Sequence, residues 1–393
     1  FYSFTQHQRE RVALWAVAAN RTRIMAHTDH HIQSPIGPRV TIDSREVDYF
    51  CGTGYLCLQS HPEVIQAAGD VLRKYGLSTA ASRGGFGEHP VYDELEKQAC
   101  RYFDTEKALF FPSGYMGMSI LLQTETTAND HIFIDSGAHY SLWDAAQTST
   151  KVTTVFRHRS PDDLAEKIRA GLQPGERPLV ISDAVFPVSG EIAPLPDYLS
   201  IIEPYHGRIF LDDAHGAGVL GEHGRGILDH YNLISEDVKT SGTLAKALGG
   251  YGGIITGPAE WIDRVDQNSG VVTGASPLPL VTAAASVKAL EIARTNPALR
   301  ETLRVNVKMA RDGLRSAGWD LEDTPVPIIC LPSRKNFSPG IVCSQLIEHG
   351  IAVDHVRNYT STPAGGALRL AICANHSPEQ IDRLVGAIRK LTR

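Results

Sequence analysis

The feature that most constrains the fold is a regular alternation, between about residues 90 and 257, of helical patterns with short segments that are almost continuously apolar. Such segments are typical of strands in a parallel sheet that helices cover on both faces. The chain is therefore predicted to have an α/β fold with a mostly parallel sheet between helices. We expect strands at residues 108–111, 131–135, 179–182, 208–212 and 253–256.

The pattern changes after Pro277, where a long helical stretch from about residue 280 to 317 leads into a smaller unit. In that unit we expect strands at 327–330, 351–354 and 368–371, and helices at 340–349 and 378–392. The chain is thus expected to have three parts, which are an N-terminal helix and arm (1–45), a large domain (46–280), and a linking helix with a small C-terminal α/β domain (281–393).

Local signals also predict helix ends. Ser60 and Pro62 predict the start of a helix, with the Ser60 hydroxyl as its cap and the proline early, where a missing N–H costs little. Gly76 predicts the end of the same helix, because glycine readily adopts the conformation that closes a helix. A further helix is expected from Pro90 to about Arg101.

The composition of the chain argues against several classes of function. The chain has 393 residues, a net charge of −6 and a mean hydropathy of −0.15, and no apolar run approaches the ~20 residues that cross a bilayer. The acidic balance argues against nucleic acid or an anionic membrane as the main partner. The six cysteines include no CxxC pair, which favours reduced thiols. We expect a cytoplasmic protein with no metal site, no nucleic-acid partner and no stable membrane insertion.

Ligands of open parallel sheets bind beyond the carboxyl ends of the strands, so polar residues there are candidate site residues. The strand at 208–212 places Asp212 at this edge, shortly before His215. A buried carboxylate needs a cation, such as a protonated heterocyclic nitrogen; the alternative is a helix-capping aspartate beside a structural histidine. Lys246 lies among small and apolar residues. Burial would give it the neutral amine that Schiff-base chemistry needs, whereas a surface lysine is the alternative.

Three further segments give weaker signals. Ser113, Gly114 and Tyr115 form a turn between a strand and a helix, and its free backbone N–H groups could bind an anion such as phosphate. His139 follows a strand end and could either lie flat on a planar cofactor or be a loop residue. Arg369 interrupts an apolar strand and needs a carboxylate partner, which is either a substrate or a structural Asp or Glu.

Together these residues supply a phosphate cradle, a ring-stacking histidine, an aspartate for a pyridinium nitrogen, a Schiff-base lysine and an arginine for a carboxylate, which is the set that pyridoxal 5′-phosphate needs. Over about residues 45–393 the sequence resembles the α-oxoamine synthases, fold-type I pyridoxal-phosphate enzymes that include 8-amino-7-oxononanoate synthase and serine palmitoyltransferase. Residues 212–226 and 242–250 are the most specific, and residues 362–377 are similar to serine palmitoyltransferase. The resemblance implies a seven-stranded large-domain sheet and a homodimer with shared active sites.

The resemblance also implies residue roles. Lys246 would form the Schiff base and shuttle protons, Asp212 would pair with the pyridine nitrogen, and His215 would hydrogen-bond the ring 3′-oxygen. His139 would stack on the ring and donate a hydrogen bond to a thioester carbonyl. Further cofactor contacts are expected from Ser113, Gly114, Tyr115, Asp183, Thr243 and, in the partner subunit, Thr273. Substrate contacts are expected from Arg369, which would bind the amino-acid carboxylate, and from Arg357, Thr53, Glu88 and His89.

The implied reaction is a decarboxylative Claisen-type condensation of a small amino acid with an acyl thioester, carried by coenzyme A or an acyl-carrier protein, to give an α-amino ketone. The sequence departs from the family pattern where substrates are expected: Thr53 replaces an asparagine, Pro187 replaces a serine, and residues 86–89 differ. A different carbon electrophile or none, as in aldol-type, Mannich-type or aminotransferase chemistry, is therefore the alternative. Lys246 disfavours a non-catalytic regulatory partner, and residues 84–87 lack the GxGxxG spacing of a nucleotide-binding protein.

Overall fold

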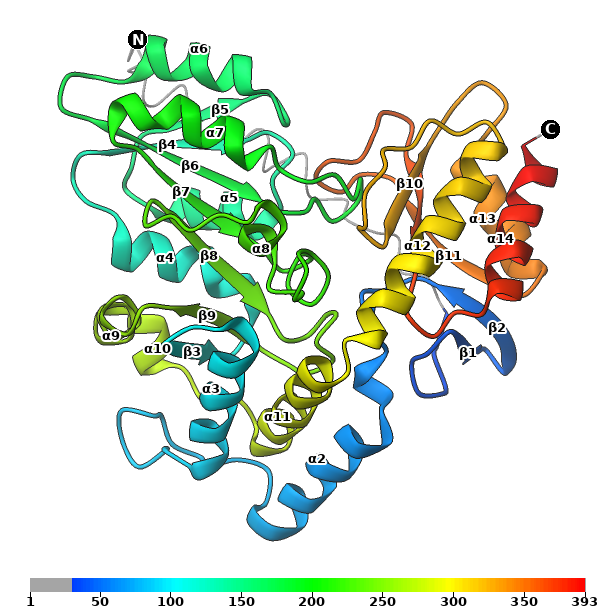
Figure 1. Cartoon of the computed structure of the whole chain (residues 1–393), viewed down its shortest axis with the longest axis horizontal. Helices are drawn as coiled ribbons and strands as arrows, with labels where there is room; N and C mark the ends of the chain where they lie inside the picture. Colours follow the sequence, from blue (N-terminus) through cyan, green and yellow to red (C-terminus); the bar gives the residue numbers. More distant parts are fainter. Residues whose placement is uncertain (1–29, 393) are drawn as a thin grey trace, which may run out of the picture.

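The computed structural model describes residues 30–392, and the helix expected near the N-terminus lies outside them. Figure 1 shows two lobes, each built on a sheet, with the long helix α12 (Ala298–Ser316) running from the junction of the lobes along the smaller one. One sheet has seven strands and the other has five. The predicted α/β fold, with a large sheet and a smaller C-terminal unit, is confirmed.

The larger sheet is mostly parallel. Its expected strands at 108–111, 131–135, 179–182, 208–212 and 253–256 are all present, whereas the apolar pattern did not predict two more, at 153–156 and 238–243. In spatial order the strands are β3 (Lys107–Phe111), β9 (Gly253–Gly257), β8 (Val238–Thr243), β7 (Arg208–Asp212), β6 (Arg177–Asp183), β4 (Asp130–Asp135) and β5 (Thr153–Phe156). Neighbours run parallel except for β9, which is antiparallel to β3 and to β8.

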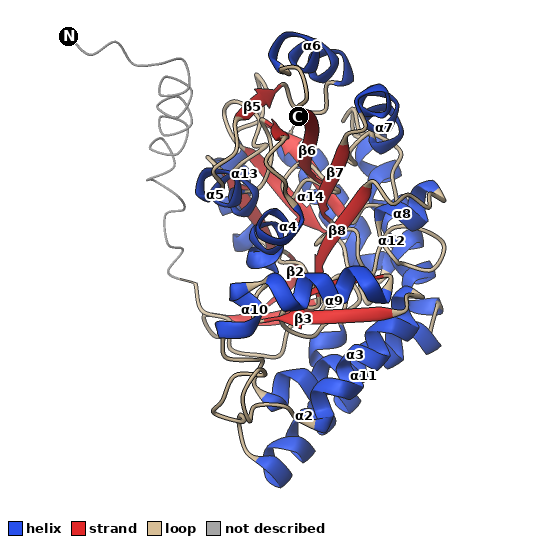
Figure 2. Ribbon diagram, turned by 90° about the vertical axis from the view of Figure 1, so that its left-hand side faces the viewer, coloured by secondary structure: helices blue, strands red, loops and turns tan. Residues whose placement is uncertain are grey.

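Both faces of this sheet are buried. In β7, Ile209 and Leu211 pack in one apolar cluster and Phe210 packs in another, because successive side chains of a strand point to opposite faces. Figure 2 shows helices on both sides of the strands. The large lobe has the helices α2 (Pro62–Tyr75), α3 (Pro90–Phe103), α4 (Gly117–Glu125), α5 (Tyr140–Thr148), α6 (Pro161–Gly171), α7 (Leu195–Ile202), α8 (Ile227–Tyr231), α9 (Ala259–Asn268), α10 (Gly270–Gly274) and α11 (Leu280–Thr295), and the short 3-10 helices η1 (Leu58–Ser60), η2 (Gly114–Met116) and η3 (Glu203–Tyr205).

Helix α2 begins and ends where the sequence predicts, but its cap differs. The ring of His61 accepts a hydrogen bond from the Glu63 backbone N–H at 3.3 Å and is the N-cap, because Pro62 occupies the first helical position. The hydroxyl of Ser60 instead donates to the carbonyl of Ile36 at 2.6 Å. The prediction of Ser60 as the cap is therefore wrong by one residue.

The smaller sheet combines strands from the beginning and from the end of the described chain. Its order is β1 (Arg39–Ile42), β2 (Arg45–Phe50), β11 (Ile351–Val356), β12 (Ala367–Ala371) and β10 (Ile328–Pro332). Strand β2 runs parallel to β11, and the other pairs are antiparallel. Helices α13 (Pro339–Glu348) and α14 (Pro378–Leu391) complete this lobe. The expected boundary between arm and large domain, at residue 46, falls inside the β1–β2 hairpin, and this hairpin belongs to the smaller sheet.

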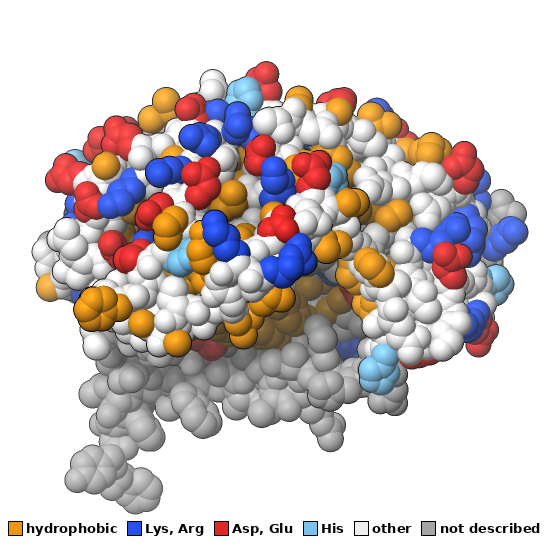
Figure 3. Space-filling view, turned by 90° about the horizontal axis from the view of Figure 1, so that it is seen from below, with side chains coloured by type: hydrophobic (Ala, Val, Ile, Leu, Met, Phe, Trp, Pro, Cys, Tyr) orange, Lys and Arg blue, Asp and Glu red, His pale blue; other side chains and the backbone are white. Residues whose placement is uncertain are grey.

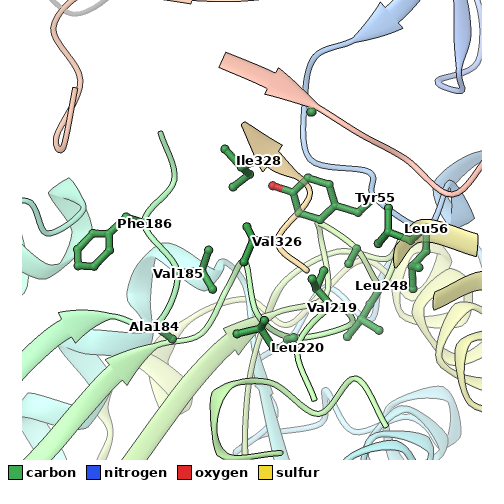
Figure 4. Packing of buried hydrophobic residues seen from close by; sticks show 14 of the residues in the cluster. Tyr55, Leu56, Ala184, Val185, Phe186, Val219, Leu220, Leu248, Val326 and Ile328 are labelled. Atoms are coloured by element: carbon green, nitrogen blue, oxygen red, sulfur yellow. The ribbon is translucent and has the colours of Figure 1, made fainter. Parts of the chain in front are cut away.

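The helical stretch expected over 280–317 is two helices. Helix α11 ends at Thr295 and α12 begins at Ala298, because Pro297 lacks the N–H that a continuous helix needs at that point. Apolar packing nevertheless joins the lobes: Val326 and Ile328 lie beside Val185 and Leu220 in one cluster (Figure 4). Among residues 30–392, no helix combines the length and the apolar character that a membrane span requires.

Candidate active site

The candidate site lies at the carboxyl edge of the seven-stranded sheet, where β6 and β7 end in carboxylates. Asp183 and Asp212 are partners in the parallel register of these strands, so their side chains meet at one edge. The Ala214 N–H donates to Asp212 Oδ1 at 3.0 Å, and the His139 N–H donates to Asp183 Oδ2 at 2.7 Å. Burial raises the pKa of both carboxyls, and the charge of Asp212 raises the pKa of Asp183 further.

Lys246 follows β8 and interacts electrostatically with both carboxylates. Burial lowers the pKa of its amine to about 8, although Asp212 and Asp183 oppose this shift. An amine with this pKa is partly neutral near physiological pH, as Schiff-base formation requires. The Lys246 charge in turn lowers the pKa of each carboxyl. If Lys246 is neutralised, the carboxylates need another cation, and a protonated ring nitrogen beside Asp212 would provide it.

A chain of polar contacts connects His215 to Arg369 through Tyr55. The Tyr55 hydroxyl lies 2.8 Å from His215 Nδ1, and an Arg369 guanidinium N–H donates to the same hydroxyl at 3.4 Å. Burial, together with the charges of Lys246 and Arg369, holds the pKa of His215 well below its usual value, so the imidazole is neutral. A neutral imidazole can donate a hydrogen bond to a phenolate-like oxygen without adding charge to the site.

Arg369 lies on β12, where its buried guanidinium is surrounded by hydrogen-bond acceptors. Its guanidinium donates to the carbonyls of Pro187 at 2.7 Å and Gly52 at 3.1 Å, and to Asp354 Oδ2 at 3.2 Å. Gly52 has a φ of 75°, a conformation that favours glycine and that turns its carbonyl toward the arginine. A structural aspartate is therefore one partner of Arg369, as the alternative interpretation predicted, and the contact with Tyr55 brings the same guanidinium to the site.

The turn after β3 and the end of β8 lie against each other. A Cβ atom on Gly114 would lie only 2.9 Å from Thr243 Cβ, so glycine is required for this close approach. Ser113 Oγ accepts a hydrogen bond from the Tyr115 N–H, and Thr243 Oγ1 donates to the Gly252 carbonyl at 2.8 Å. The buried Ser241 Oγ has no hydrogen-bond partner within residues 30–392. The structure thus brings together Gly114 and Thr243, two of the predicted cofactor contacts, with an unsatisfied hydroxyl two residues before Thr243.

His139 is the N-cap of α5 and contacts both lobes. Its Nδ1 lies 2.8 Å from Ser141 Oγ, and its Nε2 lies 2.6 Å from the Tyr359 hydroxyl, in the loop between β11 and β12. The Tyr115 ring meets it edge-on, with the two ring centroids 5.9 Å apart. The hydroxyl of Tyr115 donates to Asp144 of α5. The ring of His139 is therefore held by contacts with both lobes, while its backbone N–H contacts Asp183, and a ring in this position could stack on a planar group.

The remaining predicted residues have other neighbours in this chain. Glu88 forms an ion pair with Arg83 at 3.0 Å, and the His89 ring caps α3 by accepting from the Val91 N–H. Thr53 lies between Gly52 and Tyr55 and accepts the N–H of Tyr55 on its carbonyl.

Arg357 and Thr273 likewise have other neighbours in this chain. Arg357 is exposed and lines an open cavity of about 510 Å³ beside His355 and Asn358. Thr273 lies on α10, next to the Gly84 loop. The substrate roles of Arg357, Thr53, Glu88 and His89, and the cofactor role of Thr273, stay predictions.

Two site residues had no signal in the sequence analysis. Tyr55 follows Thr53 in a stretch without a recognisable motif, and Tyr359 lies in a loop without any motif. Both reach the site through contacts that span large sequence separations, to His215 and to His139.

The whole arrangement fits pyridoxal 5′-phosphate. Asp212 would face its ring nitrogen, the Ser113–Tyr115 turn and Thr243 would hold its phosphate, and the His139 ring would cover it. The unsatisfied Ser241 hydroxyl and the excess of buried carboxylate are features that such a cofactor would resolve.

Comparisons with known proteins identify the family of the chain. Residues 52–388 match the family model described as aminotransferase class I and II. A putative 8-amino-7-oxononanoate synthase of Desulforudis audaxviator is 33% identical over 358 residues, which cover 91% of this chain and 92% of that protein. The serine palmitoyltransferase of Sphingobacterium spiritivorum is 31% identical and covers 92% of this chain and 90% of its own.

A solved serine palmitoyltransferase from Sphingomonas wittichii has the same fold, with a TM-score of 0.85 and 24% identity over 99% of this chain and 98% of its own. Other solved serine palmitoyltransferases with this fold contain pyridoxal phosphate. The fold, the matched family model and these relatives all indicate the same family. The chain therefore belongs to the aminotransferase class I and II family and, within it, to the α-oxoamine synthases, which depend on pyridoxal phosphate.

Proposed function

We propose that this enzyme condenses a small amino acid with an acyl thioester and releases carbon dioxide and a thiol, so that the product is an α-amino ketone. The observation that carries the proposal is that the buried Lys246 lies near enough to Asp183, Asp212 and Arg369 for their charges to shift the pKa of its amine. The relatives named as 8-amino-7-oxononanoate synthase and serine palmitoyltransferase support this reaction class.

When bound, pyridoxal phosphate supplies a carbonyl that captures amines and a ring that accepts negative charge. Lys246 Nζ takes a proton from the α-carbon of the amino acid and returns one after carbon dioxide has left. Asp212 keeps a proton at the ring nitrogen, because a buried carboxylate favours a neighbouring cation. Arg369 orients the amino-acid carboxylate through its guanidinium. Positioned proton transfer of this kind contributes about 10²–10⁴-fold to a rate.

We further propose that the enzyme is a homodimer with shared sites. The apolar side chains on α2 and the loop after it support a second copy as the occupant of this face: Ile65 is 54% exposed, Leu72 50%, Leu77 61% and Phe86 fully exposed. Figure 3, seen from below Figure 1, has apolar side chains exposed among charged ones on the lower face of the molecule. The same loop lies beside Thr273, the residue expected to act across the dimer.

The test is an amino-acid panel with and without acyl thioesters. Purified holoenzyme is mixed with glycine, alanine or serine, and thiol release is followed after addition of acetyl- or palmitoyl-coenzyme A, or of the same acyl groups on a carrier protein. The proposal predicts thiol release that requires both substrates. Carbon–carbon bond formation or amine transfer without any thiol release would instead support an aldol-type, Mannich-type or aminotransferase reaction.

A further inference from the structure

The loop between β11 and β12 places a tyrosine over the candidate site. Tyr359 comes from the small lobe, and its hydroxyl lies 2.6 Å from Nε2 of His139 in the large lobe. The Tyr140 ring meets the Tyr359 ring edge-on, with centroids 4.9 Å apart, and the Tyr140 hydroxyl donates to the Asn358 carbonyl at 3.2 Å. Tyr359 is therefore held against α5 by contacts on two sides.

The hydrogen bonds of His139 fix which nitrogen carries its proton. The backbone N–H of Ser141 donates to Nδ1 at 3.2 Å. A backbone N–H is only a donor, so Nδ1 must be the unprotonated nitrogen and Nε2 must carry the hydrogen of the neutral ring. His139 Nε2–H consequently donates to the oxygen of Tyr359. The donor that the resemblance assigned to a thioester carbonyl is already used within the protein.

This arrangement leaves the hydroxyl hydrogen of Tyr359 to point elsewhere. Burial, and the negative charges of Asp183 and Asp212, raise the pKa of Tyr359 to about 12, so the phenol keeps its proton at neutral pH. Within residues 30–392, this hydroxyl has no hydrogen bond to an acceptor. The positive charge of Arg369 acts in the opposite direction and lowers the pKa of Tyr359. Tyr359 is thus close enough to Asp183, Asp212 and Arg369 to interact with their charges.

We propose that the Tyr359 hydroxyl, oriented by His139, donates a hydrogen bond to the carbonyl oxygen of the acyl thioester. This inference rests on the proposed function. In the condensation the α-carbon, having lost its proton, adds to the thioester carbonyl carbon, and the π-electron pair of the C=O bond moves onto oxygen. The pair then re-forms the C=O bond as the C–S bond breaks, and the thiolate takes up a proton. Tyr359 stabilises the charge while it resides on oxygen.

The test uses the Tyr359→Phe holoenzyme, which keeps the ring against Tyr140 and His139 and loses only the hydroxyl. Removal of one donor of this kind lowers kcat by about 10²–10³-fold, and we expect that loss in thiol release. Exchange of the α-proton of the amino acid with deuterated solvent, measured without thioester, should stay within about threefold of wild type, because that step does not involve the thioester. Cofactor absorbance should not change.

The matched control is Tyr231→Phe, which removes another part-buried hydroxyl, one on α8 that donates to the Ala193 carbonyl at 3.0 Å rather than to a residue of the candidate site. It should leave both rates near wild type. The inference is overturned if Tyr359→Phe releases thiol at the wild-type rate, or if it loses α-proton exchange to the same extent as thiol release. A wild-type enzyme that exchanges the α-proton but releases no thiol would instead overturn the proposed function, and the inference with it.

Discussion

Asp183 and Asp212 face each other as register partners at the ends of β6 and β7, and each carboxyl has its pKa raised by burial. Their nearness to Lys246 explains why the amine, although buried, keeps a pKa of about 8 rather than a lower one. The sheet therefore positions these groups at one edge and also controls the protonation of one of them. By placing two carboxylates beside one lysine, it sets the protonation of that lysine near the pH at which enzymes work.

The first prediction concerns reconstitution of apoenzyme with pyridoxal phosphate. Because only the neutral amine of Lys246 is nucleophilic, the rate should rise with pH and level off above about 8. In Asp212→Asn the midpoint should move to lower pH, since Asp212 stabilises the ammonium form. Absorbance spectra after mixing measure the rate. A midpoint near 10.5, the ordinary value for lysine, would contradict a buried Lys246.

Substitution of Arg369 should weaken amino-acid binding. Arg369→Ala removes a charge-assisted contact to the substrate carboxylate worth about 1.5–3 kcal/mol, which corresponds to an increase in the amino-acid KM of about 10–150-fold. The cofactor should still be retained, because Arg369 contacts Pro187, Gly52, Asp354 and Tyr55 rather than the predicted phosphate residues. Steady-state kinetics measure the KM. Arg101→Ala, a change at an exposed arginine on α3, is the control and should leave the KM at its wild-type value.

A second set of charged side chains, centred on His158, holds the segment that follows β6. His158 contacts Asp135 Oδ1 at 2.8 Å through Nδ1 and Glu191 Oε2 at 3.1 Å through Nε2. Burial opposes the charged imidazolium, but the hydrogen bonds to these two carboxylates raise the pKa of His158 to about 9. The hydrogen bond with His158 lowers the pKa of Glu191 to about 2, against the effect of burial.

The stability of the enzyme should therefore depend on pH through His158. The raised pKa of His158 stabilises the fold fully below about 6.5 and loses this effect as pH rises through 9. The lowered pKa of Glu191 stabilises it above about 4.5 and loses this effect as pH falls through 2. In urea unfolding, His158→Gln should cost about 1.5–3 kcal/mol between pH 4.5 and 6.5, and less toward pH 9. An equal cost at every pH would contradict the charged contact.

The proposed dimer predicts linked effects at two residues. Phe86→Asp places a charge on a fully exposed apolar side chain and should convert the dimer to a monomer in light scattering. Thr273→Ala should keep the dimer but weaken cofactor retention about tenfold, since one phosphate contact is lost. Thr295→Ala, at the exposed end of α11, is the control for the second change. Unchanged retention in Thr273→Ala would contradict a contact across the dimer.

Local sequence patterns predicted those parts of the fold and site that depend on neighbouring residues. The apolar run before Asp212 predicted both its strand and its place at the sheet edge. Strand β8, with the sequence VKTSGT, was missed because its side chains are small or polar and only partly buried. Strand β5 was missed because it is a short edge strand with two half-buried residues.

The contacts of Tyr55 and Tyr359 could not be predicted from such patterns. Each depends on how distant segments pack: Tyr55 meets His215 across 160 residues, and Tyr359 meets His139 across 220. Helix capping by His61 in place of Ser60 is a smaller difference of the same kind, because the partner that Ser60 found, the Ile36 carbonyl, belongs to a segment far from α2 in sequence.

The most direct test of the central claim is chemical trapping of the covalent link between cofactor and protein. Purified holoenzyme is reduced with borohydride, digested, and analysed by mass spectrometry for the peptide that carries the pyridoxyl group. We expect a single tagged residue, Lys246, and no tag in Lys246→Ala. A protein that binds no cofactor, or a tag on any other lysine, would contradict this expectation.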